Sequence, residues 1–508
     1  MAVIDIGSNA IRMVIAQVLP EGRVEVLERL HQAVHLGQDT FRTGYIDRKS
    51  MRHAVMILRN YRQVINTYGI KHILAVATSS VREAVNADVF IDRIAMATGF
   101  EVEIIDSSEE GRLTVSAIRN AIGNQISIGR KNTIIVEVGG GSTLITVLQR
   151  GKIIQSVSLP IGSIRLNEIF ADSSQKPDDA AKLLTRHIAS MMSNFSSVVP
   201  LGRISAFIAL GSDVMFAAKE AGQRLDDSEF YSISKGGFAK IVEKCKLHTP
   251  LEISANYGLS FSDAERLTPA LIVYQNLLSH TEANDLFVSP VSMRDGLLLE
   301  LMARITGKED SNMPEAIINS AKTVAAKYQM DTVHCQHVCD FCEKLFDDLK
   351  PLHGMSNRHK LLLKVAAMLH EIGMFVSTRA YHKHSYYLIA NTEIFGLNHS
   401  EIMIVANVAR YHRKNSPKPT HTDYINLPRQ MRIAICRLGS LLRIADALEC
   451  ERSQQIHLVK TEITDDEMTI YVRGGKGLVL EKREIAQKSD LFEDVFGLRV
   501  RLTEVTSQ

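Results

Sequence analysis

The chain has 508 residues, which is enough for about three or four domains of ordinary size. Hydrophobic residues make up 45% of it, so it can bury a large core. The 59 lysines and arginines nearly balance the 57 acidic residues, which excludes the strongly basic character of a general nucleic-acid-binding protein.

The first residues and the cysteines indicate a compartment. The segment that begins Met1–Asp5 lacks the charged start and long apolar centre of a secretory signal. No stretch reaches the roughly 18 uncharged apolar residues that a spanning helix needs. The six cysteines are few and unevenly clustered, unlike a disulfide framework. We therefore expect a cytoplasmic protein without a transmembrane segment.

Short β-branched runs alternate with helical patterns from residue 1 to about 305, which is typical of an α/β fold. The runs that predict strands are Val3–Ile6, Ile73–Ala77, Val102–Ile105, Thr133–Val138 and Ile204–Ala209. Two glycine turns each follow a strand and lead into another apolar run, which indicates two related lobes. We place the first lobe at residues 1–118 and the second at 119–306.

The remainder of the chain has a different pattern. Helical periodicity with almost no strand signal predicts an all-helical domain over residues 312–450. The runs Ile456–Thr461, Met468–Val472 and Leu498–Leu502 then predict a small β-containing domain over residues 451–508.

The two turns can bind phosphate. A strand that ends in a carboxylate and continues into glycine leaves a backbone whose N–H groups can converge on phosphate oxygens. Asp5 and Glu137, at the two strand ends, could hold Mg²⁺ through water. A single loop of this kind could equally be a glycine hairpin without a ligand, but two matched loops favour a phosphate site.

The motifs occur in the order and spacing of the exopolyphosphatase and guanosine pentaphosphatase (Ppx/GppA) family, and the chain resembles long members of that family. They are Asp5–Asn9, Ala77–Ala84, Ser108–Leu113, Gly139–Thr143, Gly162–Leu166 and Arg294–Gly296. The resemblance implies two actin-like, ribonuclease-H-like lobes of the sugar-kinase and chaperone-ATPase superfamily. It also implies a homodimer and a divalent cation.

The resemblance implies roles for particular residues. Glu110 matches the catalytic carboxylate, and Glu109 is the second candidate. The phosphate-binding set is Gly7, Ser8, Asn9, Thr78, Arg82, Gly139, Gly140, Gly141, Ser142, Thr143, Ser163 and Arg165. Ser163 and Arg165 lie beyond the second loop, so they either reach the same anion or only begin a solvated helix.

Two positions depart from the family pattern. Glu137 stands where an Asp usually precedes the triple glycine, which predicts a shifted water shell around the cation. Leu144 stands where the family commonly has a further acid, so either metal binding is weaker or another acid substitutes.

Ten of the eighteen histidines lie between residues 334 and 421. Their order resembles the HD phosphohydrolase fold, in which His, His-Asp and a distant Asp bind metal. The corresponding residues are His334, His370, Glu371 and Asp446, with His384 and His412 where binuclear enzymes have further ligands. We favour a structural or substrate-binding role over a bound metal for this domain. The basic segment 410–414 with Lys418 either lines a path for a long anion or is a solvated loop.

The predicted function is removal of terminal phosphate from inorganic polyphosphate. Within the same enzyme class, the alternative is cleavage of the 5′ phosphate of guanosine pentaphosphate. A polyphosphate or alarmone sensor that has lost turnover remains open because of Glu137 and Leu144. A kinase or chaperone of the superfamily would need an adenosine pocket, for which the sequence has no distinctive motif.

Overall fold

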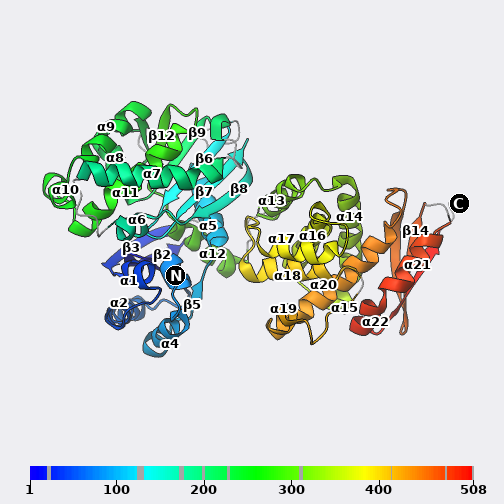
Figure 1. Cartoon of the computed structure of the whole chain (residues 1–508). Coiled ribbons are helices and arrows are strands. Elements are labelled where there is room, and N and C mark those ends of the chain that lie inside the picture. Colours follow the sequence, from blue (N-terminus) through cyan, green and yellow to red (C-terminus); the bar gives the residue numbers. More distant parts are fainter. Residues whose placement is uncertain are drawn as a thin grey trace. The chain divides into compact units, whose positions relative to one another are not determined.

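The computed structural model describes residues 1–19, 24–122, 131–170, 177–196, 201–225, 229–307, 313–413, 415–474 and 477–505. The chain divides into two compact units, Met1–Ser311 and Asn312–Gln508, and each is described by itself (Figure 1).

Among the described residues, the first unit has a five-stranded sheet in the order β3-β2-β1-β4-β5. Its strands are β1 (Ala2–Ile6), β2 (Ala10–Val18), β3 (Val24–Ala33), β4 (Ile73–Ala77) and β5 (Val102–Ile104). β1 pairs antiparallel with β2 and parallel with β4, and all of its residues are buried. The end of β1 is therefore fixed from both sides.

Helices cover both faces of this sheet because successive side chains of a strand point to opposite sides. Ile4 joins one core with Ile57, whereas Val3 joins another with Leu113. The first face carries α1 (Leu36–Thr43), α2 (Arg48–Thr67), α3 (Ser79–Arg82) and α4 (Ala87–Thr98). The second face carries α5 (Ser107–Ile122) and α12 (Met293–Thr306).

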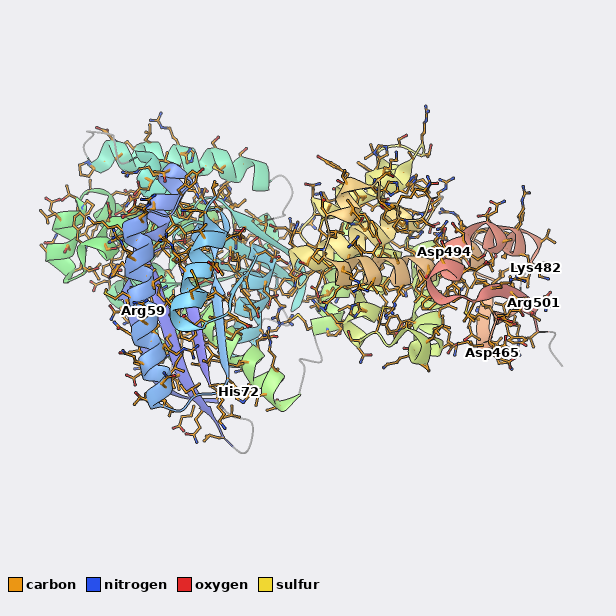
Figure 2. The ribbon with its side chains drawn as sticks, turned by 90° about the horizontal axis from the view of Figure 1, so that it is seen from below. Arg59, His72, Asp465, Lys482, Asp494 and Arg501 are labelled. Carbon is orange, nitrogen blue, oxygen red and sulfur yellow. The ribbon has the colours of Figure 1, made fainter. Side chains whose placement is uncertain are left out.

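The sequence of α2 determines where the helix begins and which of its faces packs on the sheet. The side chain of Asp47 accepts a hydrogen bond from the Lys49 N–H at 2.7 Å, which caps the helix start. Arg59 and other charged residues lie on its outer face (Figure 2). The inward face repeats every three or four residues: Met51, Ala54, Ile57, Leu58, Tyr61 and Ile65.

A second sheet in this unit has the strand order β10-β11-β12-β9-β6-β7-β8 within the described ranges. The strands are β6 (Thr133–Val138), β7 (Thr143–Gln149), β8 (Lys152–Leu159), β9 (Ala206–Leu210), β10 (Gln223–Arg224), β11 (Tyr231–Ser234) and β12 (Asp285–Ser289). β6 pairs antiparallel with β7 and parallel with β9, as β1 does with β2 and β4. The internal similarity predicted from the two glycine turns is thus confirmed.

The helices of the second sheet are α6 (Ser163–Phe170), α7 (Pro177–Ser196), η1 (Leu201–Arg203), α8 (Ser212–Ala221), α9 (Lys235–Lys246), α10 (Pro250–Tyr257) and α11 (Phe261–Ser279). They share a core with its strands, including Ile145, Phe207, Leu271 and Tyr274.

The second unit begins with helices around one apolar core. They are α13 (Met313–Lys327), α14 (Thr332–Asp348), α15 (Lys350–His353), α16 (Asn357–Leu369), η2 (Ile372–Phe375), α17 (Tyr381–Ala390), α18 (His399–Tyr411), α19 (Thr422–Ile425) and α20 (Arg429–Leu448). The predicted all-helical character of this region is confirmed for its described residues.

The chain then forms β13 (His457–Ile463), β14 (Glu467–Arg473) and β15 (Arg499–Glu504). The three predicted strands are confirmed, but the sequence did not predict α21 (Val479–Lys488) and α22 (Asp490–Phe496). These helices connect β14 to β15, which are parallel. Met468, Ile470 and Phe492 join the core of the preceding helices, so the tail continues that unit. None of the helices in the described ranges has the length and apolar character needed to cross a membrane.

α12 belongs to the predicted second lobe by sequence but packs on the first sheet. Its N-terminus is closed by a capping box between Ser292 and Asp295. Gly296 allows the close crossing with α5, since a Cβ there would overlap the carbonyl of Leu113. This crossing places Arg294 next to β1, where its Nη1 donates to Asp5 Oδ2 at 2.9 Å.

We predict that Gly296→Ala lowers the free energy of unfolding by about 1–3 kcal/mol, because α12 must move away from rigid backbone. Gly236→Ala is the control, since a Cβ there has open space and alanine favours the helix. Thermal unfolding of both variants is the measurement. Equal midpoints for Gly296→Ala and the wild-type chain would contradict the close crossing.

Candidate active site

Two matched turns lie at the ends of β1 and β6. The Gly7 N–H donates to the Ala10 carbonyl at 3.1 Å, and the Gly139 N–H donates to the Ser142 carbonyl at 2.9 Å. Each turn thus closes an antiparallel hairpin. Each also begins two residues after a carboxylate, Asp5 or Glu137.

The two turns lie close to each other. A Cβ at Gly140 would lie 3.0 Å from the Cβ of Ser8, and a Cβ at Gly141 would lie 2.6 Å from Ser79 Oγ. The hydroxyls of Ser8 and Ser79 are 3.3 Å apart. Glycine is therefore required here by close approach, and the first-loop and second-loop residues meet at one place.

The residues near the first loop are largely buried. Asn9 accepts a hydrogen bond through its Oδ1 from Ser262 Oγ at 3.3 Å, so its side chain is tied to α11. Thr78 is buried and stands at the start of α3, where its carbonyl accepts from the Val81 and Arg82 N–H groups. Ser142 stays half-buried at the end of the second turn.

Some of the residues predicted to bind phosphate make contacts that support the second loop. The N–H of Ser163 donates to the Gly139 carbonyl at 2.9 Å, and that of Arg165 donates to the Gly140 carbonyl at 3.1 Å. The hydroxyl of Thr143 donates to the Ile161 carbonyl at 2.8 Å. The backbone amides at the start of α6 therefore bind the carbonyls of the second loop.

Arg165 has several partners within the first unit. Its Nε donates to the Gly141 carbonyl at 2.8 Å, and its Nη2 donates to both carboxylate oxygens of Glu83 at 2.6 and 2.7 Å. The guanidinium also lies 4.2 Å from the ring centroid of Phe41. Arg165 thus joins the second loop to a residue beside α3, rather than presenting a free cation.

Glu110 lies near both strand-end carboxylates. Burial raises its pKa to about 7, against the attraction of Arg82, and the charges of Glu137 and Asp5 raise it further. Arg82 Nη1 donates to Glu110 Oε1 at 2.7 Å and also to the Ile105 carbonyl. The Glu110 side chain keeps 19% of its surface exposed, so water can reach it.

Its neighbour Glu109 has a different environment. Arg112 donates from Nε and Nη2 to the two Glu109 oxygens at 2.8 and 2.6 Å. The same guanidinium reaches Glu300 at 2.9 Å. Glu109 is therefore held in an ion-pair network, whereas Glu110 pairs with Arg82 and interacts electrostatically with Asp5 and Glu137.

Asp5 and Glu137 are also constrained. Arg294 contacts Asp5, and Arg12 lies 4.0 Å from the same oxygen. Burial raises the pKa of Glu137, although Arg294 and a 3.2 Å hydrogen bond from Thr114 oppose that shift. Leu144 faces Glu137 across the hairpin and is buried, so no charge stands at that position. The oxygen donors suit Mg²⁺, and their mutual repulsion would fall if a cation bound.

Sequence reasoning gave no role to four charged residues that lie near this centre. Arg12 and Arg294 border Asp5, and Arg266 lies 3.5 Å from Asp213. Burial raises the pKa of Asp213 to about 6. A signal existed for two of them: Arg294 stands in a recognised motif, and Gly211-Ser212 precedes Asp213 after β9, as glycine and serine follow β1.

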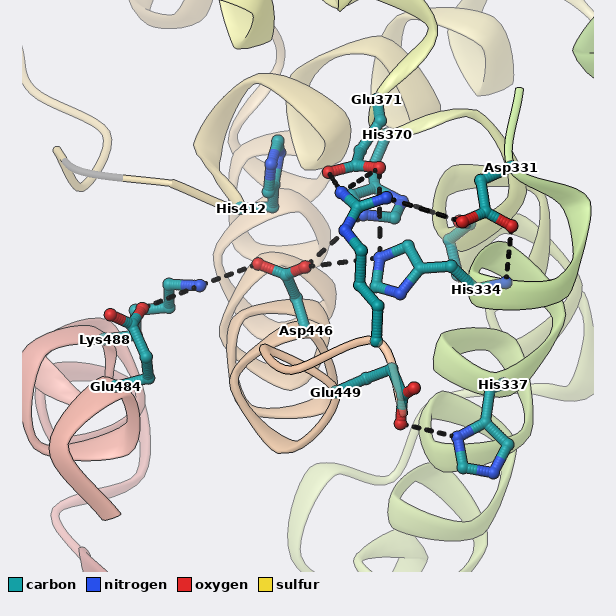
Figure 3. Close-up of polar contacts among 12 residues, drawn as sticks. Asp331, His334, His337, His370, Glu371, His412, Asp446, Glu449, Glu484 and Lys488 are labelled. Carbon is teal, nitrogen blue, oxygen red and sulfur yellow. Dashed lines mark hydrogen bonds and ion pairs between the residues drawn. The ribbon is translucent and has the colours of Figure 1, made fainter. Parts of the chain in front are cut away.

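The second unit contains a separate cluster of histidines and acids (Figure 3). His334 Nε2 lies 3.9 Å from Asp446 Oδ1 and 3.9 Å from Glu371 Oε2, and His370 Nε2 lies 3.5 Å from the same Asp446 oxygen. We call His334, His370, Glu371 and Asp446 the histidine centre. Four of the six residues predicted from the HD-like order thus come together.

The other two predicted residues differ. The His412 ring lies 4.9 Å from that of His370, but its Nδ1 is 2.5 Å from the Ala409 carbonyl and its Nε2 is 3.2 Å from the Tyr381 hydroxyl. Burial lowers the pKa of His412 to about 3. His384 lies on α17, packs against Gly373 of η2 and is half-exposed.

The basic segment 410–414, predicted either to line an anion path or to be a solvated loop, is partly neutralised. Arg410 pairs with Asp423 at 2.9 Å and lies over the ring of Tyr386. Arg413 lies over the ring of Tyr381. Lys414 lies outside the described residues.

Comparisons with known proteins agree with this architecture. The model of the Ppx/GppA phosphatase family matches residues 14–305, and that of Ppx/GppA phosphatase, domain III, matches residues 318–492. A guanosine-5′-triphosphate,3′-diphosphate pyrophosphatase of Vibrio vulnificus (strain YJ016) is 22% identical over 485 residues, which cover 94% of this chain and 90% of that protein.

Two solved structures are similar to part of the chain. An Aquifex aeolicus member of the Ppx/GppA family is 23% identical with a TM-score of 0.50, covering 61% of this chain and 98% of that one. An exopolyphosphatase from Cytophaga hutchinsonii ATCC 33406 is 22% identical with a TM-score of 0.54, covering 60% and 97%. These likenesses agree with an actin-like α/β fold, and because the first family model spans more than half of the sequence, the chain belongs to the Ppx/GppA phosphatase family.

Proposed function

We propose that this chain hydrolyses the terminal phosphoanhydride bond of a polyphosphorylated anion, with inorganic polyphosphate as its substrate. The observation that carries the proposal is the environment of Glu110. It is a carboxyl whose pKa burial raises to about 7, it contacts Arg82, and it is coupled to the acids at both glycine turns. A group of this kind can accept a proton at neutral pH.

In the proposed reaction, water attacks the terminal phosphorus while the bond from that phosphorus to the bridging oxygen breaks. Glu110 accepts the proton of the attacking water, and the remaining chain leaves with its bridging oxygen. Arg82 holds Glu110 in place and offers a planar cation to the phosphate oxygens. The N–H groups of the two turns are the further donors to the charge that develops on phosphate.

Asp5 and Glu137 would hold a divalent cation, which would neutralise phosphate charge when bound. Their hard oxygen atoms fit Mg²⁺, and Arg294 beside Asp5 already supplies positive charge to the same carboxylate. The buried Leu144 adds no oxygen, so the protein part of the proposed cation site is these two acids.

Guanosine pentaphosphate is the second candidate substrate. The observation that favours it is the match to the Vibrio vulnificus pyrophosphatase, which extends over nearly the whole chain, whereas the similar exopolyphosphatase structure covers 60% of it. Both substrates present a terminal phosphoanhydride to the same groups. If the wild-type chain binds these substrates without hydrolysing them, the protein is a sensor without turnover.

We predict that Glu110→Gln lowers phosphate release from long-chain polyphosphate about 10²- to 10⁴-fold in the presence of Mg²⁺. Glu109→Gln is the matched control, since Glu109 is paired with Arg112, and it should retain most of the activity. The measurement is orthophosphate release, repeated with guanosine pentaphosphate to rank the two substrates. Binding of both substrates without release by the wild-type chain would refute the enzyme and leave the sensor.

The rate should depend on pH in a defined direction. Below the Glu110 pKa of about 7 the carboxyl is protonated and cannot accept a proton, so kcat should rise about tenfold per pH unit and level off above it. Because Arg82 lowers this pKa, Arg82→Gln should move the midpoint to higher pH. The exposed Arg93→Gln is the control, and an unmoved midpoint in Arg82→Gln would contradict the assigned base.

Stability should show the opposite trend. The raised Glu110 pKa means that the folded chain binds this proton more tightly than the unfolded chain, so stability falls as pH rises from about 4.5 to about 7. At pH 8, Glu110→Gln should stabilise the chain by on the order of 1–3 kcal/mol, and the gain should vanish at pH 4.5. Glu109→Gln should destabilise it at pH 8, where it leaves Arg112 with one partner fewer. Unfolding midpoints at both pH values test the prediction.

A further inference from the structure

The surface of the first unit has a groove between α2 and α4. Its volume is about 450 Å³, and all of its lining residues belong to these two helices. Met51, Val55 and Ala97, each buried or half-buried, form its floor. None of the lining residues belongs to the glycine turns or to the acids of the candidate active site. The α2–α4 groove is therefore separate from the catalytic centre.

Two methionines border the floor of the groove and lie open to water. Met56 is 53% exposed and Met96 is 73% exposed. Single exposed apolar residues are common, but apolar side chains gathered around a recessed apolar floor are typical of interaction sites. The side chain of methionine is unbranched and adapts to partners of different shape. The groove thus offers an apolar surface that a partner would remove from water.

Basic residues surround this apolar surface. α2 contains five lysines and arginines and no acidic residue, although basic and acidic residues nearly balance over the whole chain. Three arginines line the groove, Arg52 and Arg59 from α2 and Arg93 from α4, and Arg59 lies on the outer surface of its helix (Figure 2). No carboxylate of the described residues forms an ion pair with any of the three. Their charge is available to an anionic partner.

Arg62 of the same helix has a different environment. Its Nε donates to the Thr98 carbonyl at 2.6 Å, and its guanidinium lies 4.2 Å from the ring centroid of Phe100. These contacts tie α2 to the end of α4. Within the part of the chain that the structure describes, the three groove arginines make one polar side-chain contact, from Arg93 Nη1 to Met51 Sδ at 3.8 Å. They are therefore not needed to hold the two helices together.

An acidic amphipathic helix fits this chemistry. The apolar face of a helix can lie in a groove between two others, with side chains entering at intervals of three or four residues. Carboxylates beside that face would meet the arginines, whose planar guanidinium binds both oxygens of a carboxylate. A polyphosphate chain would satisfy only the arginines, because it has no apolar group for the methionines. A membrane would touch Met56 and Met96 but, being flat, would leave the recessed floor uncovered.

We propose that the α2–α4 groove is a docking site for an acidic amphipathic helix of a partner protein. The apolar side chains of the partner cover Met56 and Met96 and reach the floor at Val55, and its carboxylates pair with the groove arginines. The opposite face of α2 packs on the first sheet through Ile57 and Leu58. Docking therefore leaves the core of this unit unchanged and adds a binding function that is independent of phosphoanhydride hydrolysis.

The test uses a displayed library of peptides about 18 residues long, or about five helical turns. The peptides carry Leu, Phe or Met at helical spacing and Asp or Glu at the other positions, and they are selected on the full-length chain. Recovered peptides should bind the wild-type chain with a Kd on the order of 1–100 μM. Arg59→Glu should weaken binding at least about tenfold, because it sets like charges against each other. Met96→Ser should weaken it at least about threefold, because it removes an apolar contact.

Arg48→Glu is the matched control. Arg48 is an exposed arginine of the same helix that does not line the groove, so its reversal should leave peptide affinity unchanged within about twofold at physiological salt. Arg59 and Met96 are also exposed, so all three variants should keep the thermal unfolding midpoint of the wild-type chain. An unchanged midpoint separates lost docking from lost folding.

The proposal is overturned if no recovered peptide loses affinity for Arg59→Glu, or if Arg48→Glu weakens binding as much as Arg59→Glu does. Two further results would replace the partner helix with another occupant. Binding to phosphatidylglycerol vesicles that Arg59→Glu and Met96→Ser abolish, with no peptide recovered, would make the groove a membrane contact. Self-association of the wild-type chain that Arg59→Glu alone reverses, measured by sedimentation, would assign the groove to a second copy of this chain.

Discussion

The electrostatic repulsion among Asp5, Glu110 and Glu137 is the main constraint on the candidate active site of the first unit. The fold brings Glu110 of α5 into electrostatic contact with Asp5 and Glu137, which precede the two hairpin turns, and burial raises the pKa of Glu110 and Glu137. Such an arrangement is unfavourable on its own, because each charge lacks full solvation. The surrounding arginines offset part of that cost, and a bound cation would offset more. The site is therefore built to attract positive charge and, through it, phosphate.

The backbone around these acids leaves little freedom. The turns must be glycine-rich because Gly140 and Gly141 meet the first loop and Ser79 at near van der Waals distance. Several polar groups that resemble phosphate ligands by sequence, such as the hydroxyl of Thr143, also hold the second loop. Rigid loops cost less to order when a substrate binds, so these supporting contacts contribute to binding without touching the substrate.

The sequence predicted the parts of this arrangement that are local. A strand, a carboxylate and a glycine turn are neighbours in the chain, so Asp5, Glu137 and both loops could be identified directly. Arg294 could not be placed in the same way, because its contact with Asp5 depends on α12 packing against α5 at Gly296. The ion pair of Arg165 could not be predicted for a similar reason, because its partner Glu83 lies 82 residues away. Long-range ion pairs of this kind leave no periodic signal in the sequence.

The second unit shows the same limit. The order of His334, His370 and Asp446 predicted that they would gather, and they do. The sequence could not predict that Arg452 and Lys488, which follow the helical region, would neutralise the two acids of the cluster. In both units, buried carboxylates are held by arginine or lysine from a distant element. A cation bound at either place would compete with that side chain, so its affinity would depend on how firmly the fold holds the arginine or lysine as well as on the ligands themselves.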